Sequence, residues 1–366
     1  MKRLILTILL ISGLQTYAQA QYEYIFKDVV RNAATEPKDQ GATGTCWCFG
    51  TTSFIESEII RKGGPALDLS EMFTVRYNYL TRTFDDYIRK GKGRVSQGSL
   101  PQMVINEMKS NGCVPESVYP GKGPDSLHNH KLLFGLISQK AKDAVKAKAG
   151  YPRAEYEEIL DGCLGKVPET FVFEGREYTP KSFFKSLKIN TDEYVMLTSF
   201  THHPFYKAFD VEIIDNWNHQ QMYNLPLDEF IEVIDYALRK GYTVAWDGDI
   251  TNPGYDQAKC ISLNTAEDIR EMPSLPARCK ELKVTQENRQ QRFETFQFTD
   301  DHIEHIVGIA EDQEGVKYYI TKNSWKTSIY TSGYHNMSEE YVKAYTVCVM
   351  VNVKSIPKSI RRKLGL

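Results

Sequence analysis

The sequence predicts an α+β protein with a helical lobe, a β lobe and a cleft between them. Apolar residues recur at helical spacing early in the chain, as in CWCFGTTSFIESEIIRK at 46–62. Near the end the pattern changes to alternating, β-branched residues, in HIEHIVGIAE, VKYYITKNSW and YVKAYTVCVMVNV. The 366 residues are 41% hydrophobic and 25% charged, which is ordinary for a globular chain with a large core. Helices early and strands late are typical of the α+β class.

Residues 1–20, MKRLILTILLISGLQTYAQA, have the pattern of a secretory signal peptide. Lys2 and Arg3 form a basic start, an apolar run follows, and Ala18 and Ala20 have the spacing of a cleavage site. The run is about half of the roughly 20 apolar residues that a transmembrane anchor needs. No cysteine follows it to accept a lipid. We therefore expect export to the periplasm or the medium, with no membrane association after cleavage.

The charge and the cysteine count exclude several classes of protein. Removal of the signal takes away Lys2 and Arg3 and no acid, so the net charge of −2 becomes −4, which predicts no nucleic-acid partner. The cysteines are scattered, and the chain is too long to need a disulfide framework. Their odd number leaves at least one free thiol. We expect no cofactor. The seven are Cys46, Cys48, Cys113, Cys163, Cys260, Cys279 and Cys348.

The predicted helices place one cysteine at a helix start. Cys46 opens the helical pattern, Thr45 precedes it as a possible N-cap, and the Gly-Gly-Pro run at 63–65 stops it. A thiol at a helix N-terminus with a nearby histidine has a lowered pKa and becomes a nucleophile. Further elements are expected as helices at 70–80, 100–110, 135–149 and 227–240 and as a strand at 243–249.

A predicted hairpin near the C-terminus supplies a histidine and an asparagine. If its turn centres on DQEG, His302 and Asn323 fall near the same end of the hairpin, about one pairing step apart. There an asparagine side chain can hold an imidazole in the tautomer and orientation that a base needs. Cys46, His302 and Asn323 would then fill the three roles of a cysteine peptidase site. His305 is the alternative base, because the register alone does not choose between the two histidines.

Gln40 supplies a fourth role, the hydrogen-bond donor for the oxyanion of a tetrahedral intermediate. It lies six residues before Cys46, across a turn that contains Gly41 and Gly44. At that distance its amide can aim at the same point as the Cys46 backbone N–H.

These residues resemble the papain-like cysteine peptidases. The matching motifs are Gln40 with Cys46-Trp47, Asp301-His302 with a glycine six residues further on, and KNSW at 322–325. The papain pattern has its histidine about 130–150 residues after the cysteine, whereas 256 residues separate positions 46 and 302 here. The longer spacing indicates an insertion between the cysteine and the histidine. In this respect the chain resembles the branch of bleomycin hydrolase and the aminopeptidase C type. The segments VTQENRQQRFETFQFTDDH, SFTHHPFY, DNWNHQQMYNLPLDEF and GYTVAWDGD also resemble that branch, and the likeness covers 24–366.

The resemblance implies a role for each matching residue, and its spacing from the histidine to Gly308 selects His302 over His305. The implied roles are nucleophile for Cys46, general base and acid for His302, orienting residue for Asn323, oxyanion donor for Gln40, aromatic shield for Trp325, and substrate-backbone wall for Gly98 and Ser99.

The resemblance also implies how the mature chain is organised. In this branch the chain's end lies in the cleft near the substrate's α-amine, so Leu366 is the candidate that restricts cleavage to N-terminal residues. Five bases just before it would repel an α-ammonium at short range. The branch forms hexameric rings, so a homo-oligomer is expected. The expected parts of the peptidase domain, 21–366, are a helical lobe at about 40–120, an insertion at about 121–285, a β lobe at about 286–353 and a tail at 354–366.

The predicted function is an exported cysteine aminopeptidase that hydrolyses peptides through a thioester acyl-enzyme. Too few residues precede Gln40 for the long inhibitory prosegment of many papain relatives. One alternative is a catalytically impaired peptide-binding scaffold, because Lys326 replaces the family's glycine after NSW. Another is a peptidase with endopeptidase activity. A thiol oxidoreductase using Cys46 and Cys48 is disfavoured, since redox pairs usually have two residues between their thiols.

Other candidate groups have ordinary structural explanations. Cys48 lacks the spacing and the second pair of a zinc site and is expected to pack inside its helix. His202-His203 is expected in a packed turn, because no further ligands stand at metal spacing. Asp247 and Asp249, at alternate positions of a strand end, are not expected to act as paired carboxylates. The cysteines other than 46 and 48 are expected in the core or in disulfides.

Overall fold

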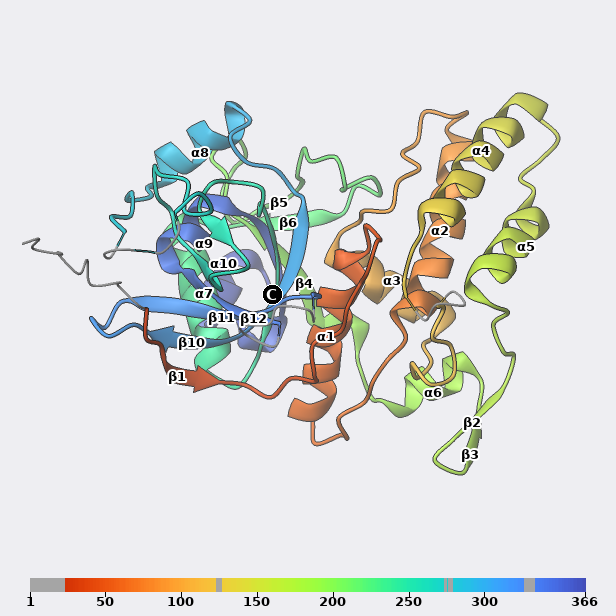
Figure 1. Ribbon diagram of the computed structural model, residues 1–366, viewed down its shortest axis with the longest axis horizontal. Helices are drawn as coiled ribbons and strands as arrows, with labels where there is room; N and C mark the ends of the chain where they lie inside the picture. Colours follow the sequence, from red (N-terminus) through yellow and green to blue (C-terminus); the bar gives the residue numbers. More distant parts are fainter. Residues whose placement is uncertain (1–23, 123–126, 273–274, 276–278, 326–332) are drawn as a thin grey trace, which may run out of the picture.

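The computed structural model describes residues 24–122, 127–272, 275, 279–325 and 333–366. The predicted signal peptide at 1–20 and Lys326 lie outside the described residues. Figure 1 shows helices α2 to α6 gathered on one side, the large sheet with α7 to α10 on the other, and α1 between them. The predicted α+β class with two lobes is confirmed.

Helix α1 (Cys46–Arg61) is the element on which both lobes pack. Every residue from Trp47 to Ile59 is buried, so the helix has no solvent-facing stripe in that part. It contacts β10 and β7 of the sheet and, in the other lobe, α2 and α3. Gly50 permits the close approach to β10, because a Cβ there would lie 2.9 Å from the Ile303 carbonyl oxygen.

The helical lobe begins with two capped helices. The Ser70 side chain accepts a hydrogen bond from the Phe73 N–H at the start of α2, and Pro101 occupies the first turn of α3. The predicted helices over 70–80, 100–110 and 135–149 are confirmed, the first of them longer than expected. The bounds are α2 (Glu71–Ile88), α3 (Pro101–Asn111), α4 (Lys131–Ala147), α5 (Arg153–Leu164), α6 (Pro180–Ser186), β2 (Phe171–Phe173) and β3 (Arg176–Tyr178).

The β lobe is built on one sheet with the strand order β5-β6-β4-β13-β7-β10-β11-β12-β9-β8, and β1 also pairs with β10. α7, predicted over 227–240, contacts β1, β7 and β10. The strands are β1 (Lys27–Arg31), β4 (Tyr194–Thr198), β5 (Ala208–Asp210), β6 (Gln221–Asn224), β7 (Val244–Gly248), β8 (Tyr255–Asp256), β9 (Ile261–Ser262), β10 (His302–Glu311), β11 (Lys317–Lys322), β12 (Tyr334–Ser338) and β13 (Thr346–Asn352). The helices are α7 (Leu227–Arg239), α8 (Gln286–Glu294), α9 (Glu339–Tyr345) and α10 (Lys358–Leu364).

The predicted hairpin is formed by β10 and β11. His305 pairs with Lys322 and Glu311 with Lys317, with one irregularity between them. This register places His302 and Asn323 at the same end of the hairpin, as the position of the turn predicts.

The last predicted strand, over 341–353, is wrong in its first half. Residues 339–345 form α9, and only β13 is extended. The Ser338 side chain accepts a hydrogen bond from the Tyr341 N–H and starts a helix there. Tyr341, Val342 and Tyr345 are buried from that helix, a spacing that also fits helical periodicity.

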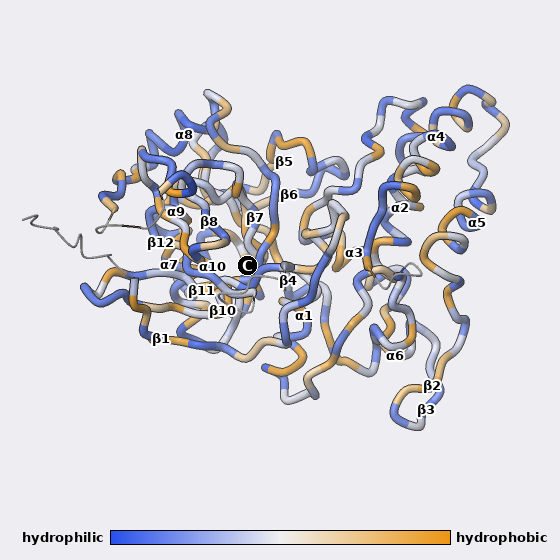
Figure 2. The backbone as a smooth tube through the Cα atoms, in the orientation of Figure 1, coloured by the Kyte–Doolittle hydropathy of each residue, from blue (hydrophilic) through white to orange (hydrophobic). Residues whose placement is uncertain are grey.

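The segment expected as an insertion, about 121–285, is distributed over both lobes. α4 and α5 pack with α2 in the helical lobe, whereas β4, β6 and β7 join the sheet. Hydrophilic and hydrophobic stretches alternate along both lobes (Figure 2). Among the described residues, no helix combines the length and apolar character needed to cross a bilayer.

Candidate active site

Cys46 is the first residue of α1 and lies against the sheet. Its N-cap residue Thr45 does not cap with its side chain, a correction to the sequence expectation, because its hydroxyl lies 2.6 Å from that of Thr43. The first turn therefore gains no cap from Thr45, and amide groups at this end stay available to a ligand. The backbone N–H of Ile303 donates a hydrogen bond to the Cys46 thiol. Ile303 follows His302, so the thiol contacts β10 at the residue next to the predicted base.

The His302 side chain is held by Asn323 across a distance of 2.8 Å between Nε2 and Oδ1. The Asn323 Oδ1 also accepts from the Ser324 N–H at 2.7 Å, and its Nδ2 donates to the Tyr255 hydroxyl at 2.9 Å and to Gln257 Oε1 at 3.0 Å. These partners fix which end of the amide faces His302. Because an amide oxygen only accepts, Nε2 carries the proton, and Nδ1 of a neutral His302 has the free lone pair.

Tyr255 and Gln257 are site residues that the sequence reasoning missed. They come from β8 and the residue after it, in a segment with no recognisable motif. Ser324 lies within the KNSW motif but had no role assigned to it.

Trp325 covers the histidine. The two ring centroids are 4.7 Å apart with 32° between the ring planes. His302 is only 4% exposed, so its contact with Asn323 is shielded from water, as the resemblance implies.

Gln40 is buried and held at both ends of its amide. The Ser324 hydroxyl donates to Gln40 Oε1 at 2.5 Å, and Gln40 Nε2 donates to the Thr43 carbonyl at 2.7 Å. Its backbone N–H also donates to the Ser324 carbonyl at 3.0 Å. An amide nitrogen has two hydrogens, so the second one remains for a ligand beside Cys46.

The electrostatics favour a neutral pair at rest, a correction to the lowered thiol pKa expected from the sequence, because the burial of Cys46 outweighs the effect of its place at the helix start. Desolvation raises the pKa of the Cys46 thiol to about 12, and the nearby Asp247 and Asp215 add to that shift, which the Ile303 N–H opposes. Desolvation lowers the pKa of His302 to about 4, an effect that the hydrogen bond from His302 Nε2 to Asn323 opposes. Either charge alone is therefore unfavourable, whereas proton transfer from the thiol to the imidazole creates both together.

Gly98 and Ser99 lie where the inserted segment meets the helical lobe. A Cβ on Gly98 would come within 2.1 Å of Asp215 Oδ2, and Ser99 Oγ accepts from Trp217 Nε1 at 3.1 Å. Their role in holding the substrate backbone stays a prediction.

Leu366 follows the C-terminal helix α10, whose last turn is tied to the β lobe. Lys363 pairs with Glu229 at 2.7 Å, and the Leu366 N–H donates to the Arg361 carbonyl. In the part of the chain that is described, no hydrogen bond or ion pair joins Leu366 to Cys46 or His302.

The alternatives within the site have clear positions. His305 Nδ1 lies 2.8 Å from the Ser53 hydroxyl and not beside Asn323. Cys48 is fully buried, with its thiol 3.3 Å from the Glu71 carbonyl oxygen, and so packs inside the lobe as expected. All seven cysteines are free, so the disulfide alternative for the others is wrong. Asp247 accepts from the Cys348 thiol, whereas Asp249 binds backbone N–H groups of its own loop.

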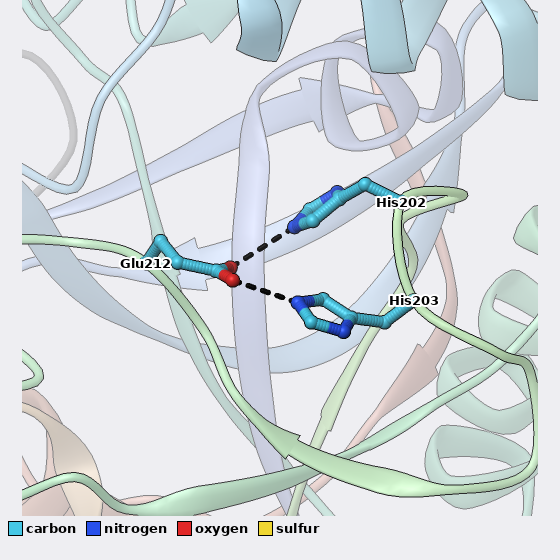
Figure 3. Close-up of side chains that lie close together, drawn as sticks. All are labelled: His202, His203 and Glu212. Atoms are coloured by element: carbon cyan, nitrogen blue, oxygen red, sulfur yellow. Dashed lines mark hydrogen bonds and ion pairs between the residues drawn. The ribbon is translucent and has the colours of Figure 1, made fainter.

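The two consecutive histidines do acquire a third possible metal ligand, contrary to the sequence expectation. His202 Nε2 lies 3.0 Å and His203 Nε2 2.7 Å from the two oxygens of Glu212, as Figure 3 shows. However, Gln290 Nε2 donates to His202 Nδ1 at 2.9 Å, while Gln290 Oε1 accepts from the Thr201 N–H. His202 therefore carries its proton on Nε2, the atom that a metal would need, and donates it to Glu212.

A thiol at a helix start, beside an imidazole whose tautomer an amide fixes, gives this fold the chemistry of a cysteine peptidase of the papain type. The family comparison is consistent with that class: residues 94–365 match the Peptidase C1-like family, and residues 26–160 match the papain family of cysteine proteases. The chain belongs to the Peptidase C1-like family.

Curated relatives extend over most of the chain. Aminopeptidase G of Lactobacillus delbrueckii subsp. lactis is 22% identical, covering 89% of this chain and 83% of the relative. Aminopeptidase C of Streptococcus thermophilus is 23% identical over 91% of this chain and 84% of its own. Bleomycin hydrolase of Rattus norvegicus is 21% identical over 92% and 85%. The predicted resemblance to this branch is confirmed.

A solved structure shows the same fold. PepW from Lactobacillus rhamnosis superposes with a TM-score of 0.72 at 20% identity, covering 93% of this chain and 84% of that one.

Proposed function

We propose that the protein is a cysteine aminopeptidase that removes N-terminal residues from peptides. The observation that carries the proposal is the fixed amide of Asn323, which leaves His302 Nδ1 free to accept a proton, while the Cys46 thiol contacts Ile303, the next residue of β10. The similarity to aminopeptidases G and C supports the preference for the amino end.

The proposed reaction uses the four residues in turn. His302 Nδ1 takes the thiol proton, and the Cys46 sulfur attacks the carbonyl carbon of the scissile bond. The oxyanion accepts hydrogen bonds from the Cys46 N–H and Gln40 Nε2. The imidazolium protonates the leaving amine as the C–N bond breaks, which leaves a thioester. A water molecule then loses a proton to His302 and attacks the thioester, releasing the acid and restoring the thiol.

Two measurements test this proposal. A thiol-directed epoxide inhibitor should label Cys46 stoichiometrically, and the label should be lost in Cys46→Ala but retained in Cys48→Ala, the matched buried thiol of the same helix. A peptide with a free N-terminus should lose residues one by one, while its N-acetylated copy stays intact. Cleavage of the acetylated copy inside the chain would favour the endopeptidase alternative, and absence of both labelling and cleavage would favour the inactive scaffold.

The role of Leu366 remains a separate proposal. Deletion of residues 365–366 should allow cleavage of the acetylated peptide if the terminal carboxylate restricts the enzyme. Unchanged products would remove Leu366 from the site.

We also propose export after cleavage at residue 20 and assembly into a homo-oligomer. N-terminal sequencing of the secreted or periplasmic protein should begin at Gln21, and retention of residues 1–20 would contradict the signal. Light scattering of the purified protein measures its oligomeric state. We expect the mass of a hexamer, and the mass of a monomer would contradict the proposed assembly.

A further inference from the structure

A buried carboxyl group lies behind the candidate site. Glu304 is two residues after His302 on β10, so both side chains lie on the same face of the strand. Glu304 is fully buried, and its Oε1 lies 3.9 Å from His302 Nε2. The peptidase reaction as described above does not use it.

The permanent partners of Glu304 are neutral. The Tyr255 hydroxyl lies 2.9 Å from Oε1, and His335 Nδ1 lies 3.3 Å from Oε2. Burial, together with the neighbouring His302, lowers the pKa of His335 to about 3, so it is uncharged at neutral pH. Among the described residues, no lysine or arginine forms an ion pair with Glu304. His302, when it holds the thiol proton, is therefore the cation available to it.

The other groups around Glu304 do not add charge. Trp246 of β7 pairs opposite Glu304 in the sheet. A hydrogen bond from Thr321 of β11 lowers the pKa of Glu304, and the charge of Glu304 raises the pKa of Tyr341 of α9. The Tyr341 hydroxyl bonds to Asn252 and to the Asp249 carbonyl oxygen. Burial raises the pKa of Glu304 to about 8, so the group is neutral or ionised depending on its neighbours.

Tyr255 connects Glu304 to the orienting residue. Its hydroxyl accepts from Asn323 Nδ2 and has one proton to give, either to Glu304 Oε1 or to Gln257 Oε1, which is 2.8 Å away. An ionised Glu304 takes that proton as a hydrogen bond, and a protonated Glu304 leaves it to Gln257. The charge of Glu304 therefore changes the hydrogen bonds that hold Asn323, and through Asn323 those that hold His302.

We propose that Glu304 is a positioning residue whose carboxylate stabilises the imidazolium of His302 and thereby increases the fraction of Cys46 thiolate. The effect is electrostatic, across the 3.9 Å contact, and is supported by the Tyr255 bridge to Asn323. As pH rises, Glu304 releases its proton to solvent, and the thiol proton moves more readily to His302 Nδ1. The inference needs only the thiol and imidazole pair, not the choice between aminopeptidase and endopeptidase.

The test is the pH dependence of Cys46 alkylation by iodoacetamide, which reacts with the thiolate, releases iodide and requires no peptide substrate. The unaltered protein should show a rate step where Glu304 ionises. Glu304→Gln keeps an acceptor for Tyr255 but stays neutral, so the step should vanish and the rate above it should fall by about tenfold or more, equivalent to one pKa unit at His302. Below the step the two proteins should agree.

Two variants separate this role from a structural one. Tyr255→Phe removes the bridge but retains the carboxylate, so the step should remain while peptide turnover falls. Glu107→Gln changes another buried carboxyl, held by Thr81 and Asn111 in the helical lobe, and should leave the profile unchanged. A profile in Glu304→Gln that is lowered equally at every pH would overturn the proposal. The absence of that step from the profile of the unaltered protein would also overturn it, and this result does not depend on the folding of a variant.

Discussion

The Ser324 hydroxyl donates a hydrogen bond to Gln40 Oε1 at 2.5 Å, which leaves the amide nitrogen of Gln40 to donate to the Thr43 carbonyl, three residues before α1. This contact joins residues 284 positions apart in the sequence. It links the proposed oxyanion donor directly to the motif that contains Asn323.

Gln40→Ala should lower kcat about 10²–10³-fold with little change in KM, because the oxyanion loses one of its two donors. Ser324→Ala should lower kcat only about fivefold, the effect of losing one hydrogen bond that positions the amide. Steady-state kinetics on single-residue fluorogenic amides measure both. Alkylation of Cys46 forms no oxyanion and is the control, so a matching loss of alkylation in Gln40→Ala would contradict the assigned role.

His302→Ala removes the group that takes the thiol proton, and because desolvation raises the pKa of the Cys46 thiol to about 12, the thiol should stay protonated at pH 7. The alkylation rate should then fall at least about a hundredfold and rise steadily with pH, without a plateau below pH 9. His219→Ala, at an exposed histidine, is the matched control. An unchanged rate at pH 7 in His302→Ala would show that another group activates the thiol.

Gly308→Ala should destabilise the fold by about 1–3 kcal/mol, the cost of overpacking a tight contact. A Cβ at this position would lie 2.2 Å from the Val30 carbonyl oxygen of β1. Gly135→Ala, in α4 with no atom within 4 Å of the new Cβ, should instead stabilise it by about 0.5–1 kcal/mol. Urea unfolding measures both, and equal midpoints would contradict the prediction.

Gln290→Glu should create a zinc site that the unaltered protein lacks. A carboxylate at 290 can accept a hydrogen bond from His202 Nδ1–H, and this tautomer frees Nε2 for the metal beside His203 and Glu212. Calorimetric titration should show zinc affinity at least about tenfold above that of the unaltered protein. Tight zinc binding before the substitution would refute the proton assignment at His202.

Glu304→Gln should stabilise the protein increasingly as pH rises. Burial raises the pKa of Glu304 to about 8 in the folded state, above the value of about 4.3 expected for an unfolded chain. Between about pH 4 and pH 8 the folded chain thus holds a proton that the unfolded chain releases. The stability that the protonated Glu304 contributes is fully present below about pH 4 and is lost as pH rises to about 8. Thermal unfolding across that range should show that the Tm of Glu304→Gln, relative to that of the unaltered protein, increases as pH rises. Asp143→Asn, on the exposed face of α4, should show no such trend.

The sequence predicted the parts of the site that come from recognisable local patterns. The helix start at Cys46 and the hairpin bearing His302 follow from periodicity and turn position, and the structure has both. Tyr255, Gln257 and Glu304 did not follow, because their importance arises from contacts across the sheet between strands far apart in sequence. In the sequence, Glu304 is one polar residue of a predicted strand. Only the folded structure shows that its carboxyl group lies close to His302.

The pairing of Glu212 with both histidines escaped prediction for a similar reason. Metal-ligand spacing is a local signal, whereas the Glu212 carboxylate reaches them from the other end of a loop nine or ten residues away. The helix at 339–345 was missed because the two tyrosines and the one valine at positions 341–345 fit either periodicity, and the Ser338 cap decides between them.

The pairing of β1 with β10 bears on the order in which the protein becomes active. β1 begins at Lys27, early in the chain, yet its partner is the strand that begins with His302. The thiol and the oxyanion donor are made early in synthesis, but the groups that activate and anchor them arrive only after some 300 residues. A chain emerging from the ribosome therefore carries an inert cysteine until its last strands close the sheet.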